Sequence, residues 1–518
     1  MKESDLPNIT RSRPVGTLLA ALIAGAIAAA VVLTITQPPG PGLDPDSASY
    51  LGAAQSLAQG RGYRIPISDW ATADSTSPLS HFPPGYPTAV AMPLLVGASP
   101  SQAARFVNAI AAFVDVALGV WFVANVAGVI ASVALALAVL AMPPFLEVHL
   151  SILSEPLFFA CMVGALVAMV DLSAQTDERR RIHCAFLAGL AAAAAMLTRY
   201  AGVAVVGAVL LWTFVQPGER GTRMRRLLVA ALPVAFLVGA WMVRVHLTSG
   251  AHAIRTLGTY GGFAGTLSMG ISTAVAWLVP LMSDQTLPGR GWIALALAVA
   301  LVLAITVGAR ITRHTTARRA IAATMMLAGC YVVVLVLSRL LADPAIPFDD
   351  RILSPLFLLV TIGAAIAISA WWREARLPAR VLAGAALIAW FGASLTVSLD
   401  EASWALENGQ DLAETQWTES PLLAWARANA PRATLYTNWP PAVFFHLHRA
   451  SHELPSAADM SALRAFADTM RVRNGIVLLF DQPNPDQPVS DTLLRSAGLG
   501  QLARRSDGAV LAPLRVHR

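Results

Sequence analysis

The sequence predicts an all-α bundle that crosses a membrane about eleven times and ends in a small α/β domain on the outer side. Of its 518 residues, 56% are hydrophobic and 13% are charged, and the mean hydropathy is +0.59. Soluble domains carry about 25% charged and about 45–50% apolar residues. The composition therefore excludes a soluble globular protein, a disordered chain and a nucleic-acid-binding protein that relies on the basic pI of 9.6.

Eleven apolar stretches support this fold class, because a helix needs about 17–25 apolar residues to cross the hydrocarbon layer. They lie at 15–36, 103–124, 126–145, 153–172, 184–199, 200–215, 227–246, 289–309, 320–341, 353–371 and 381–398. The fifth and sixth form one apolar run broken at Thr198-Arg199-Tyr200, where we expect a helical hairpin. The apolar segment 268–283 is predicted to be a re-entrant or interfacial helix.

The distribution of charge predicts the orientation. Segments 1–14, 173–183, 216–226, 310–319 and 372–380 sum to +11, whereas the rest of the chain sums to −5. Basic residues near spans favour the cytoplasmic side. We therefore expect a cytoplasmic N-terminus at 1–14, a membrane domain at 15–398 that includes an outer loop at 37–102, and an outer domain at 399–518.

The region 399–518 differs from the rest because its apolar runs are only five to seven residues long. A helix is expected at 420–429, a strand at 433–437, a helix opening at Pro440-Pro441 and a buried strand at 475–480. This alternation predicts a small α/β domain. Cys161, Cys184 and Cys330 all fall in or beside apolar runs, so no disulfide is expected in the outer loops.

The first outer loop holds the most informative pattern. Asp46 lies where a helix is expected to begin, and Tyr50, Leu51, Ala54 and Leu57 recur with helical spacing. This pattern predicts a short amphipathic helix at the membrane surface. Asp46 is either a helix N-cap, which contributes about 1 kcal/mol, or a catalytic group.

Other polar residues interrupt or border apolar runs, and each has two interpretations. Arg199 either binds an anion at the outer boundary or extends to the interface merely to orient its helix. Arg351 either faces a phosphate or only pairs with the adjacent Asp349 and Asp350. Glu155 either contacts substrate or, with Pro156, simply begins a helix.

His81 and Asp115 have similar alternatives. His81 either contacts substrate or is an ordinary exposed loop histidine that precedes the rigid turn Phe82-Pro-Pro-Gly-Tyr-Pro87. Asp115 lies inside the second span, where an unpaired carboxylate is costly. It therefore either pairs with a neighbouring helix or handles substrate.

Together these features resemble a known family. The Asp–x3–Tyr spacing of Asp46 and Tyr50, a helix ending in Gly60-Arg-Gly62 and the Phe-Pro-Pro-Gly-Tyr-Pro turn resemble the first outer loop of GT-C superfamily glycosyltransferases. These enzymes use polyprenyl-phosphate sugars and include protein O-mannosyltransferases and lipid A aminoarabinose transferases. The similarity extends to Leu153-Ser-Glu-Pro-Leu-Phe158, to Thr198-Arg-Tyr200 and to Asp350-Arg-Ile-Leu-Ser-Pro355. It covers residues 15–371.

The resemblance implies the roles of the candidate residues. An acidic residue in the first outer loop acts as the catalytic base, and Asp46 occupies the matching position. Many relatives carry Asp-Glu there, whereas this chain has Asp-Ser, so the substrate subclass stays open. The remaining substrate or phosphate contacts are expected among Arg199, Arg351, Tyr50, His81, Tyr200, Glu155 and Asp44.

The resulting expectation is an inverting glycosyltransferase of a bacterial plasma (inner) membrane. Its partners are a polyprenyl-phosphate-linked sugar, an acceptor that is a protein, a lipid or a polysaccharide, and membrane lipids, with no nucleic acid. No cofactor is expected, although Asp44-Pro-Asp46 matches the Asp-x-Asp pattern that can hold a divalent metal. The alternative function is a membrane transporter or flippase for an anionic or lipid-linked substrate.

Overall fold

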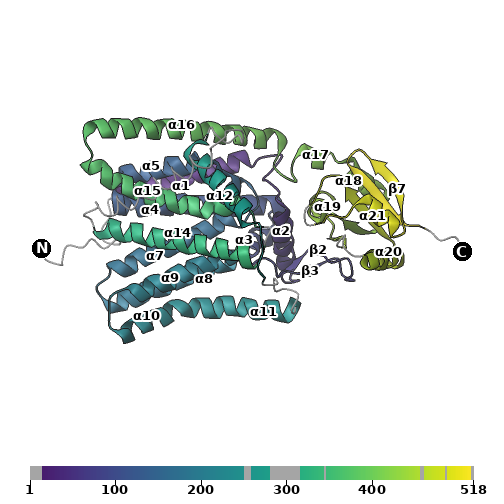
Figure 1. Cartoon of the computed structure of the whole chain (residues 1–518), viewed down its shortest axis with the longest axis horizontal. Coiled ribbons are helices and arrows are strands. Elements are labelled where there is room, and N and C mark those ends of the chain that lie inside the picture. The colour runs from purple at the N-terminus through teal and green to yellow at the C-terminus, as the bar shows by residue number, and fades with distance from the viewer. Residues whose placement is uncertain are drawn as a thin grey trace.

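Helices of membrane-spanning length make up most of the molecule. The computed structural model describes residues 15–249, 258–280, 315–343, 346–455, 460–484 and 487–514. The helices run roughly along the long axis of the molecule, and a smaller α/β unit caps one end (Figure 1). The chain is thus a multi-pass membrane protein with an α/β region at its C-terminus.

Within the described residues, eight helices are long and apolar enough to cross a membrane. They are α1 (Val15–Ile35), α4 (Pro100–Ala127), α7 (Glu155–Ala174), α8 (Glu178–Thr198), the continuous α10, η3 and α11 (Arg220–Pro233, Val234–Val238, Gly239–Ser249), α14 (Thr315–Leu341), α15 (Asp350–Glu374) and α16 (Leu377–Asn408). Each corresponds to one predicted stretch. The predicted stretch 289–309 lies outside the described residues.

The predicted hairpin at Arg199 is confirmed. Arg199 is extended, with φ −144° and ψ 138°, between α8 and the short helices η2 (Tyr200–Gly202) and α9 (Val203–Val215). Arg181, near the start of α8, donates to the carbonyl of Pro217 just after α9 at 3.3 Å. The two helices therefore run antiparallel, and η2 with α9 forms an apolar segment of 16 residues, shorter than a typical span.

The predicted single span at 126–145 is instead broken. α5 (Val129–Leu140) and α6 (Pro143–Leu150) meet at an angle of 60°. Pro143 and Pro144 lack amide hydrogens and cannot continue α5. If the bent pair counts as one span, the described residues contain nine candidate spans. The predicted re-entrant segment corresponds in part to α12 (Phe263–Leu278), a short apolar helix of 16 residues.

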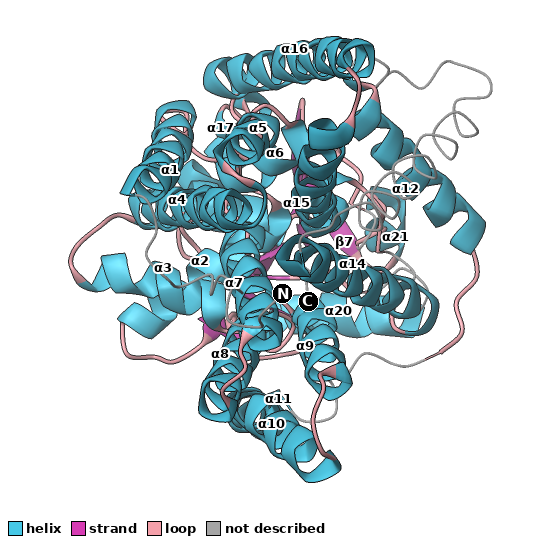
Figure 2. Ribbon diagram, turned by 90° about the vertical axis from the view of Figure 1, so that its left-hand side faces the viewer, coloured by secondary structure: helices cyan, strands magenta, loops and turns pink. Residues whose placement is uncertain are grey.

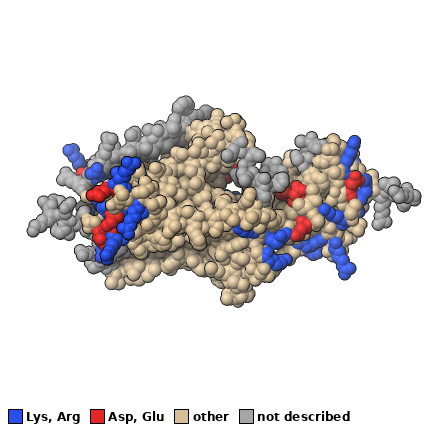
Figure 3. Space-filling view, turned by 90° about the horizontal axis from the view of Figure 1, so that it is seen from below, with Lys and Arg blue, Asp and Glu red and all other residues tan. Residues whose placement is uncertain are grey.

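Small residues pack among large apolar side chains in the bundle interior, and other large apolar side chains, such as Ile130 and Phe236, face outward. Alanines of α4, α7, α8 and α9 line the main core, which permits close helix contacts. The end-on view in Figure 2 shows α16 and the α10–α11 helix at the periphery. On the face shown in Figure 3, charged side chains gather at the end of the bundle and on the α/β unit, with an uncharged band between them. This distribution fits a membrane-embedded body.

The segment between α1 and α4, which keeps the name first outer loop after its predicted side, folds against both the bundle and the α/β unit. It forms α2 (Pro45–Ala58), β1 (Arg64–Ile65), β2 (Ile67–Ser68), β3 (Ser77–Pro78) and α3 (Gly85–Leu95). The prediction of an amphipathic surface helix was wrong for α2. Its residues from Ser47 to Ala54 are all buried, because α3, α4 and α19 of the α/β unit pack around it.

The predicted C-terminal α/β domain is confirmed. Its elements are α17 (Thr415–Thr418), α18 (Pro421–Asn429), β4 (Thr434–Thr437), α19 (Pro440–Leu447), β5 (Ser451–His452), α20 (Met460–Arg473), β6 (Gly475–Phe480), α21 (Asp491–Ser496), β7 (Leu499–Arg505) and β8 (Gly508–Pro513). The sheet order is β2-β5-β4-β6-β8-β7, parallel from β2 to β6 and antiparallel from there on.

One strand of this sheet comes from the first outer loop. β2 pairs in parallel with β5, with Ile67 opposite Ser451 and Ser68 opposite His452. The His452 ring and the Ser68 hydroxyl share a hydrogen bond of 2.9 Å. The first outer loop and the C-terminal region are therefore joined by a common sheet.

Candidate functional site

Arg351 lies at the centre of a cluster of ion pairs. It sits in the first turn of α15, and its guanidinium contacts three carboxylates. Nε donates to Glu155 Oε1 at 2.7 Å, Nη1 donates to Asp44 Oδ2 at 3.1 Å, and Nη2 pairs with Asp46 Oδ2. The guanidinium thus holds two acids of α2 and its N-terminus against the start of α7.

Glu155 links Arg351 to the second arginine of the cluster. Its side chain is fully buried and also forms an ion pair with Arg199. Arg199 Nη1 donates to the Ser154 hydroxyl at 3.3 Å, and that hydroxyl shares a hydrogen bond of 3.1 Å with Tyr50. A buried carboxylate is costly unless it is paired, so Glu155 can be charged here only because two guanidinium groups surround it.

We refer to Asp44, Asp46, Tyr50, Ser154, Glu155, Arg199 and Arg351 as the ion-pair cluster. Its members come from four helix ends: the starts of α2, α7 and α15, and the break between α8 and α9. The start of α3 abuts this break because Gly85 has no side chain. A Cβ at Gly85 would lie 2.7 Å from the carbonyl oxygen of Leu197.

The start of α2 differs in one respect from the prediction. Asp44, not Asp46, is the N-cap, because its side chain accepts a hydrogen bond of 2.9 Å from the amide of Asp46. Pro45 occupies the first helical position, which suits its fixed φ. Capping is therefore assigned to Asp44, and the carboxylate of Asp46 projects from the first turn towards Arg351.

The electrostatic environment of Asp44 is unusual. Burial raises the pKa of Asp44 from 3.8 to about 7, the guanidinium of Arg351 opposes that rise, and the neighbouring Asp46 adds to it. Burial likewise raises the pKa of the Tyr50 hydroxyl, which stays protonated as a hydrogen-bonding group. If Asp44 is neutral, the two remaining carboxylates of the cluster balance the two guanidinium groups.

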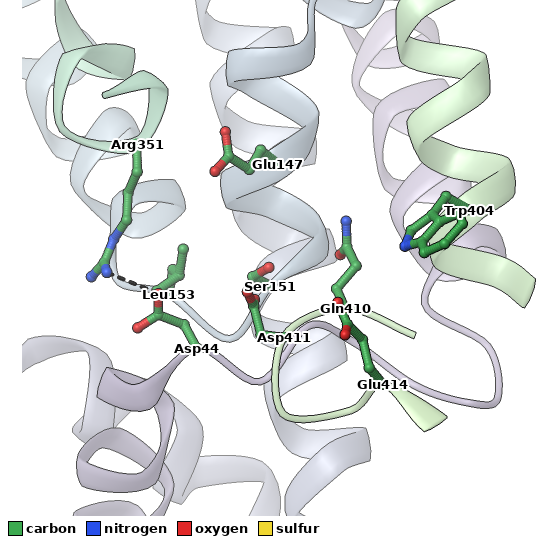
Figure 4. A pocket seen from close by; sticks show the side chains of 9 residues that line it. All are labelled: Asp44, Glu147, Ser151, Leu153, Arg351, Trp404, Gln410, Asp411 and Glu414. Atoms are coloured by element: carbon green, nitrogen blue, oxygen red, sulfur yellow. Dashed lines mark hydrogen bonds and ion pairs between the residues drawn. The ribbon is translucent and has the colours of Figure 1, made fainter. Parts of the chain in front are cut away.

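A pocket of about 260 Å³ opens beside the cluster. Figure 4 shows Asp44 and Arg351 on one side of it, and residues of α6, of α16 and of the segment after α16 on the other. Its lining residues are Asp44, Glu147, Ser151, Leu153, Arg351, Trp404, Gln410, Asp411 and Glu414. The pocket thus gives a small molecule access to the Asp44 and Arg351 side of the cluster.

Six of the eight predicted site residues meet in the cluster: Asp44, Asp46, Tyr50, Glu155, Arg199 and Arg351. The other two lie nearby without joining it. His81 stacks edge-on with Phe82, which in turn stacks on Tyr50. Tyr200 donates to the carbonyl of Ser80 at 3.0 Å and accepts a hydrogen bond from Trp241.

The structure corrects one interpretation of neighbouring acids and decides between the two alternatives for Asp115. Arg351 does not pair with the adjacent acids: Asp349 caps α15 through the amide of Ile352 at 2.9 Å, and Asp350 accepts from Trp277 at 2.7 Å. Asp115 is fully buried and pairs with His149 of α6 at 3.0 Å. The pairing alternative for Asp115 is therefore the one that the structure shows.

Sequence reasoning missed Ser154 and the far wall of the pocket. Ser154 is part of the Leu-Ser-Glu-Pro motif, so its position beside Glu155 was a usable signal. Glu147, Asp411 and Glu414 carried no motif, because only the tertiary fold brings α6 and the segment after α16 together.

Asp44 and Asp46 both contact Arg351 instead of converging on a shared empty site. Across the part of the chain that the structure describes, no group of three or more His, Cys, Asp or Glu side chains is placed to hold a metal ion. In this structure the two carboxylates of the Asp-x-Asp pattern therefore bind one guanidinium, that of Arg351.

Comparisons with known proteins agree with the architecture. No protein-family model matches the sequence, and no curated protein sequence matches it. Among solved structures, ArnT from Cupriavidus metallidurans bound to undecaprenyl phosphate is similar over 97% of this chain and 98% of its own, with 14% identity and a TM-score of 0.53.

Two archaeal structures are similar as well. The Archaeoglobus fulgidus oligosaccharyltransferase in complex with Zn and sulfate matches 94% of this chain and 73% of its own, with 12% identity and a TM-score of 0.55. AglB from the same organism, in complex with an inhibitory peptide and a dolichol-phosphate, matches 89% of this chain and 69% of its own, with 12% identity and a TM-score of 0.56. The chain therefore has the GT-C-like fold that the motifs of its first outer loop implied.

Proposed function

We propose that the chain is an inverting glycosyltransferase that moves a sugar from a polyprenyl-phosphate donor to an acceptor hydroxyl or amine at the outer face of the membrane. The observation that carries this proposal is the cluster itself, in which Arg351 and Arg199 share Glu155 and Arg351 also holds Asp46. The bound lipid phosphates of ArnT and AglB, which share the fold, support a donor of this chemical class.

The two arginines suit the leaving group. When the bond between the sugar and the lipid phosphate breaks, the phosphate changes from a diester to a monoester and gains about one negative charge. A guanidinium binds phosphate oxygens in pairs and stays protonated at any physiological pH. Cations fixed in place before the reaction stabilise such a developing charge strongly. Glu155 holds the two guanidinium groups close together before the donor arrives.

Asp46 is proposed as the general base. Its side chain is 30% exposed, and only Oδ2 faces Arg351. In the proposed step, the acceptor oxygen or nitrogen attacks the anomeric carbon while Asp46 takes its proton. The bond from the anomeric carbon to the phosphate oxygen breaks on the opposite side, and the electron pair leaves with the phosphate beside the arginines. A single displacement of this kind inverts the anomeric centre.

The test uses Asp46→Asn, which keeps the shape of the side chain but cannot accept the proton. A positioned general base contributes about 10²–10⁴-fold. We expect kcat to fall by at least about 100-fold in proteoliposomes that contain a radiolabelled undecaprenyl-phosphate sugar, with product formation and donor consumption both measured. The matched control is Asp74→Asn, which lies in the same outer loop but is exposed and pairs only with Arg64 among the described ion pairs.

Turnover at the wild-type rate in Asp46→Asn would contradict the assignment of the base. Movement of the lipid across the bilayer without sugar transfer, in wild-type protein, would favour a flippase and contradict the transferase proposal as a whole.

A further inference from the structure

The chain segment just before Asp44 runs as a short strand between two others. Gly42 pairs with the segment after α6: its amide donates to the carbonyl of Leu150 at 3.0 Å, and its carbonyl accepts from Ile152 at 2.9 Å. On the other edge, Leu43 pairs with the segment after α16. Its amide donates to the carbonyl of Gln410 at 3.3 Å, and its carbonyl accepts from the amide of Leu412 at 3.2 Å. We call this arrangement the main-chain bridge.

We infer that the C-terminal region positions residues of the active site, an inference that rests on the proposed function. The main-chain bridge sets the positions of Asp44, Asp46 and Glu155 relative to Arg351. Leu43 immediately precedes the N-cap of α2, and Ile152 lies three residues before Glu155. The chain that leads to Asp44 and Asp46 and the chain that leads to Glu155 therefore both continue directly from the main-chain bridge.

The outer strand of the bridge is anchored in the C-terminal core. Leu412 is 2% exposed and packs in one apolar cluster with Trp417, Leu422 and Val443, and Leu43 packs against the same cluster. His446 of α19 donates from Nε2 to the carbonyl of Leu412 at 2.9 Å. Any movement of the C-terminal domain is thus passed to the residue that adjoins Asp44.

The bridge has little room for adjustment. A Cβ at Gly42 would lie 2.2 Å from the hydroxyl oxygen of Ser151 and 3.1 Å from the amide oxygen of Gln410. Asp411, between the two bonded residues of the outer strand, has φ +54°, a conformation that Asn tolerates and β-branched residues rarely adopt. These two positions allow each edge of the bridge to be disturbed separately.

The first experiment disturbs the inner edge. Gly42→Ala must displace the side chain of Ser151, which lies between the bonded residues Leu150 and Ile152. If this displacement reaches Glu155, a shift of about 1 Å can cost about 100-fold in rate. We expect kcat to fall at least about tenfold, with a smaller change in KM for the donor. Adding Ser151→Ala removes the clashing oxygen, so the double variant should recover to within about threefold of Ser151→Ala alone.

The second experiment disturbs the outer edge and compares two variants that have the same charge. Asp411→Asn and Asp411→Val both remove the carboxylate, but only valine opposes the left-handed backbone. We expect Asp411→Val to have at least about a tenfold lower kcat than Asp411→Asn, at similar amounts of folded protein. Equal rates for the two variants would overturn the role of the C-terminal edge.

Hydrogen exchange gives a readout that does not depend on turnover. The amides of Gly42, Leu43, Ile152 and Leu412 should be protected in the wild-type protein and should exchange faster in Gly42→Ala. Full activity of Gly42→Ala, or no rescue by Ser151→Ala, would refute the inference while Asp46→Asn still supported the transferase. If the wild-type protein transfers no sugar, the proposed function fails, and the positioning inference fails with it even if the amides are protected.

Discussion

Arg351 shows how one side chain can organise a partly buried charged site. Its five N–H groups form a planar fork, and three of them are directed to three different carboxylates. An ammonium group is a point charge without this geometry. The number and direction of the donors, and not only the positive charge, therefore hold Asp44, Asp46 and Glu155 together.

Arg351→Lys tests this distinction. The charge is kept, but a lysine cannot reach three acids at once, so we expect kcat to fall by about 10–100-fold and the thermal unfolding midpoint to fall by several degrees. Arg373→Lys is the control, since Arg373 lies at the other end of α15 and donates to the carbonyl of Ala127. Similar losses in the two variants would show that the substitution, not the cluster, is responsible.

The raised pKa of Asp44 predicts that the stability of the folded protein depends on pH. Its pKa is raised to about 7 in the folded protein, so between about pH 4 and pH 7 the folded state binds more protons than the unfolded state. Raising the pH through this window should therefore lower the free energy of unfolding, by at most about 1.4 kcal/mol per pH unit. Asp44→Asn should flatten this slope in thermal unfolding curves recorded in detergent.

Asp69→Asn is the control for that measurement, because Asp69 belongs to the same outer loop but is exposed. It should keep the wild-type slope. An unchanged slope in Asp44→Asn would show that Asp44 does not titrate in this range.

Residue patterns predicted the members of the site better than their partners. The motifs singled out Asp46, Glu155, Arg199 and Arg351, all of which meet in the cluster. The partner of Arg351 was predicted wrongly because Asp349 and Asp350 are adjacent in sequence, whereas α15 turns them to other groups. The direction of a side chain in the first turn of a helix depends on how that helix is oriented, which the sequence spacing alone does not reveal.

Among the elements, α6 is tied to α4 by a buried polar pair, His149 and Asp115. His149 Nδ1 donates to the carbonyl of Phe145 at 2.7 Å, so Nε2 faces Asp115 at 3.0 Å. Whether the shared proton resides on the imidazole or on the carboxyl group, the pair carries no net charge. This neutrality allows both side chains to be fully buried inside the bundle.

Asp115→Asn and Asp115→Leu both remove the carboxyl group, but only asparagine keeps a hydrogen bond to His149. An asparagine amide can donate to Nε2 of His149, whereas leucine leaves Nε2 buried and unpaired. We expect Asp115→Leu to be less stable than Asp115→Asn by about 1–3 kcal/mol in detergent unfolding. Equal stability of the two variants would show that the pair does not stabilise the packing of α6 on α4.

Long apolar elements were the most predictable part of the fold, because the length of a span is set by the bilayer. The broken span and the buried α2 were not predictable in this way. Pro143 and Pro144 mark a break, but the direction of α6 comes from tertiary contacts such as the hydrogen bond from Asn108 to the carbonyl of Ser151. Similarly, α2 is covered by α19, which is nearly 400 residues away in sequence.

At the scale of the whole molecule, the asymmetry of basic residues predicts which end of the bundle faces the cytoplasm. The prediction of an outward C-terminal domain can be tested with single added cysteines, since Cys161, Cys184 and Cys330 all lie within span-forming helices. In spheroplasts, a membrane-impermeant maleimide should label Leu502→Cys, which replaces a 59% exposed residue. Arg180→Cys should react only after permeabilisation, and the reverse pattern would invert the proposed topology.

The shared sheet also has a consequence for biosynthesis. The β2 segment leaves the ribosome roughly 380 residues before its partner β5, which at about 5–20 residues per second corresponds to a delay of roughly 20–80 s. For that time β2 in the nascent first loop has no partner strand in this sheet. A prematurely terminated polypeptide would therefore insert its helices yet lack both the partner strand of β2 and the pocket residues that follow α16.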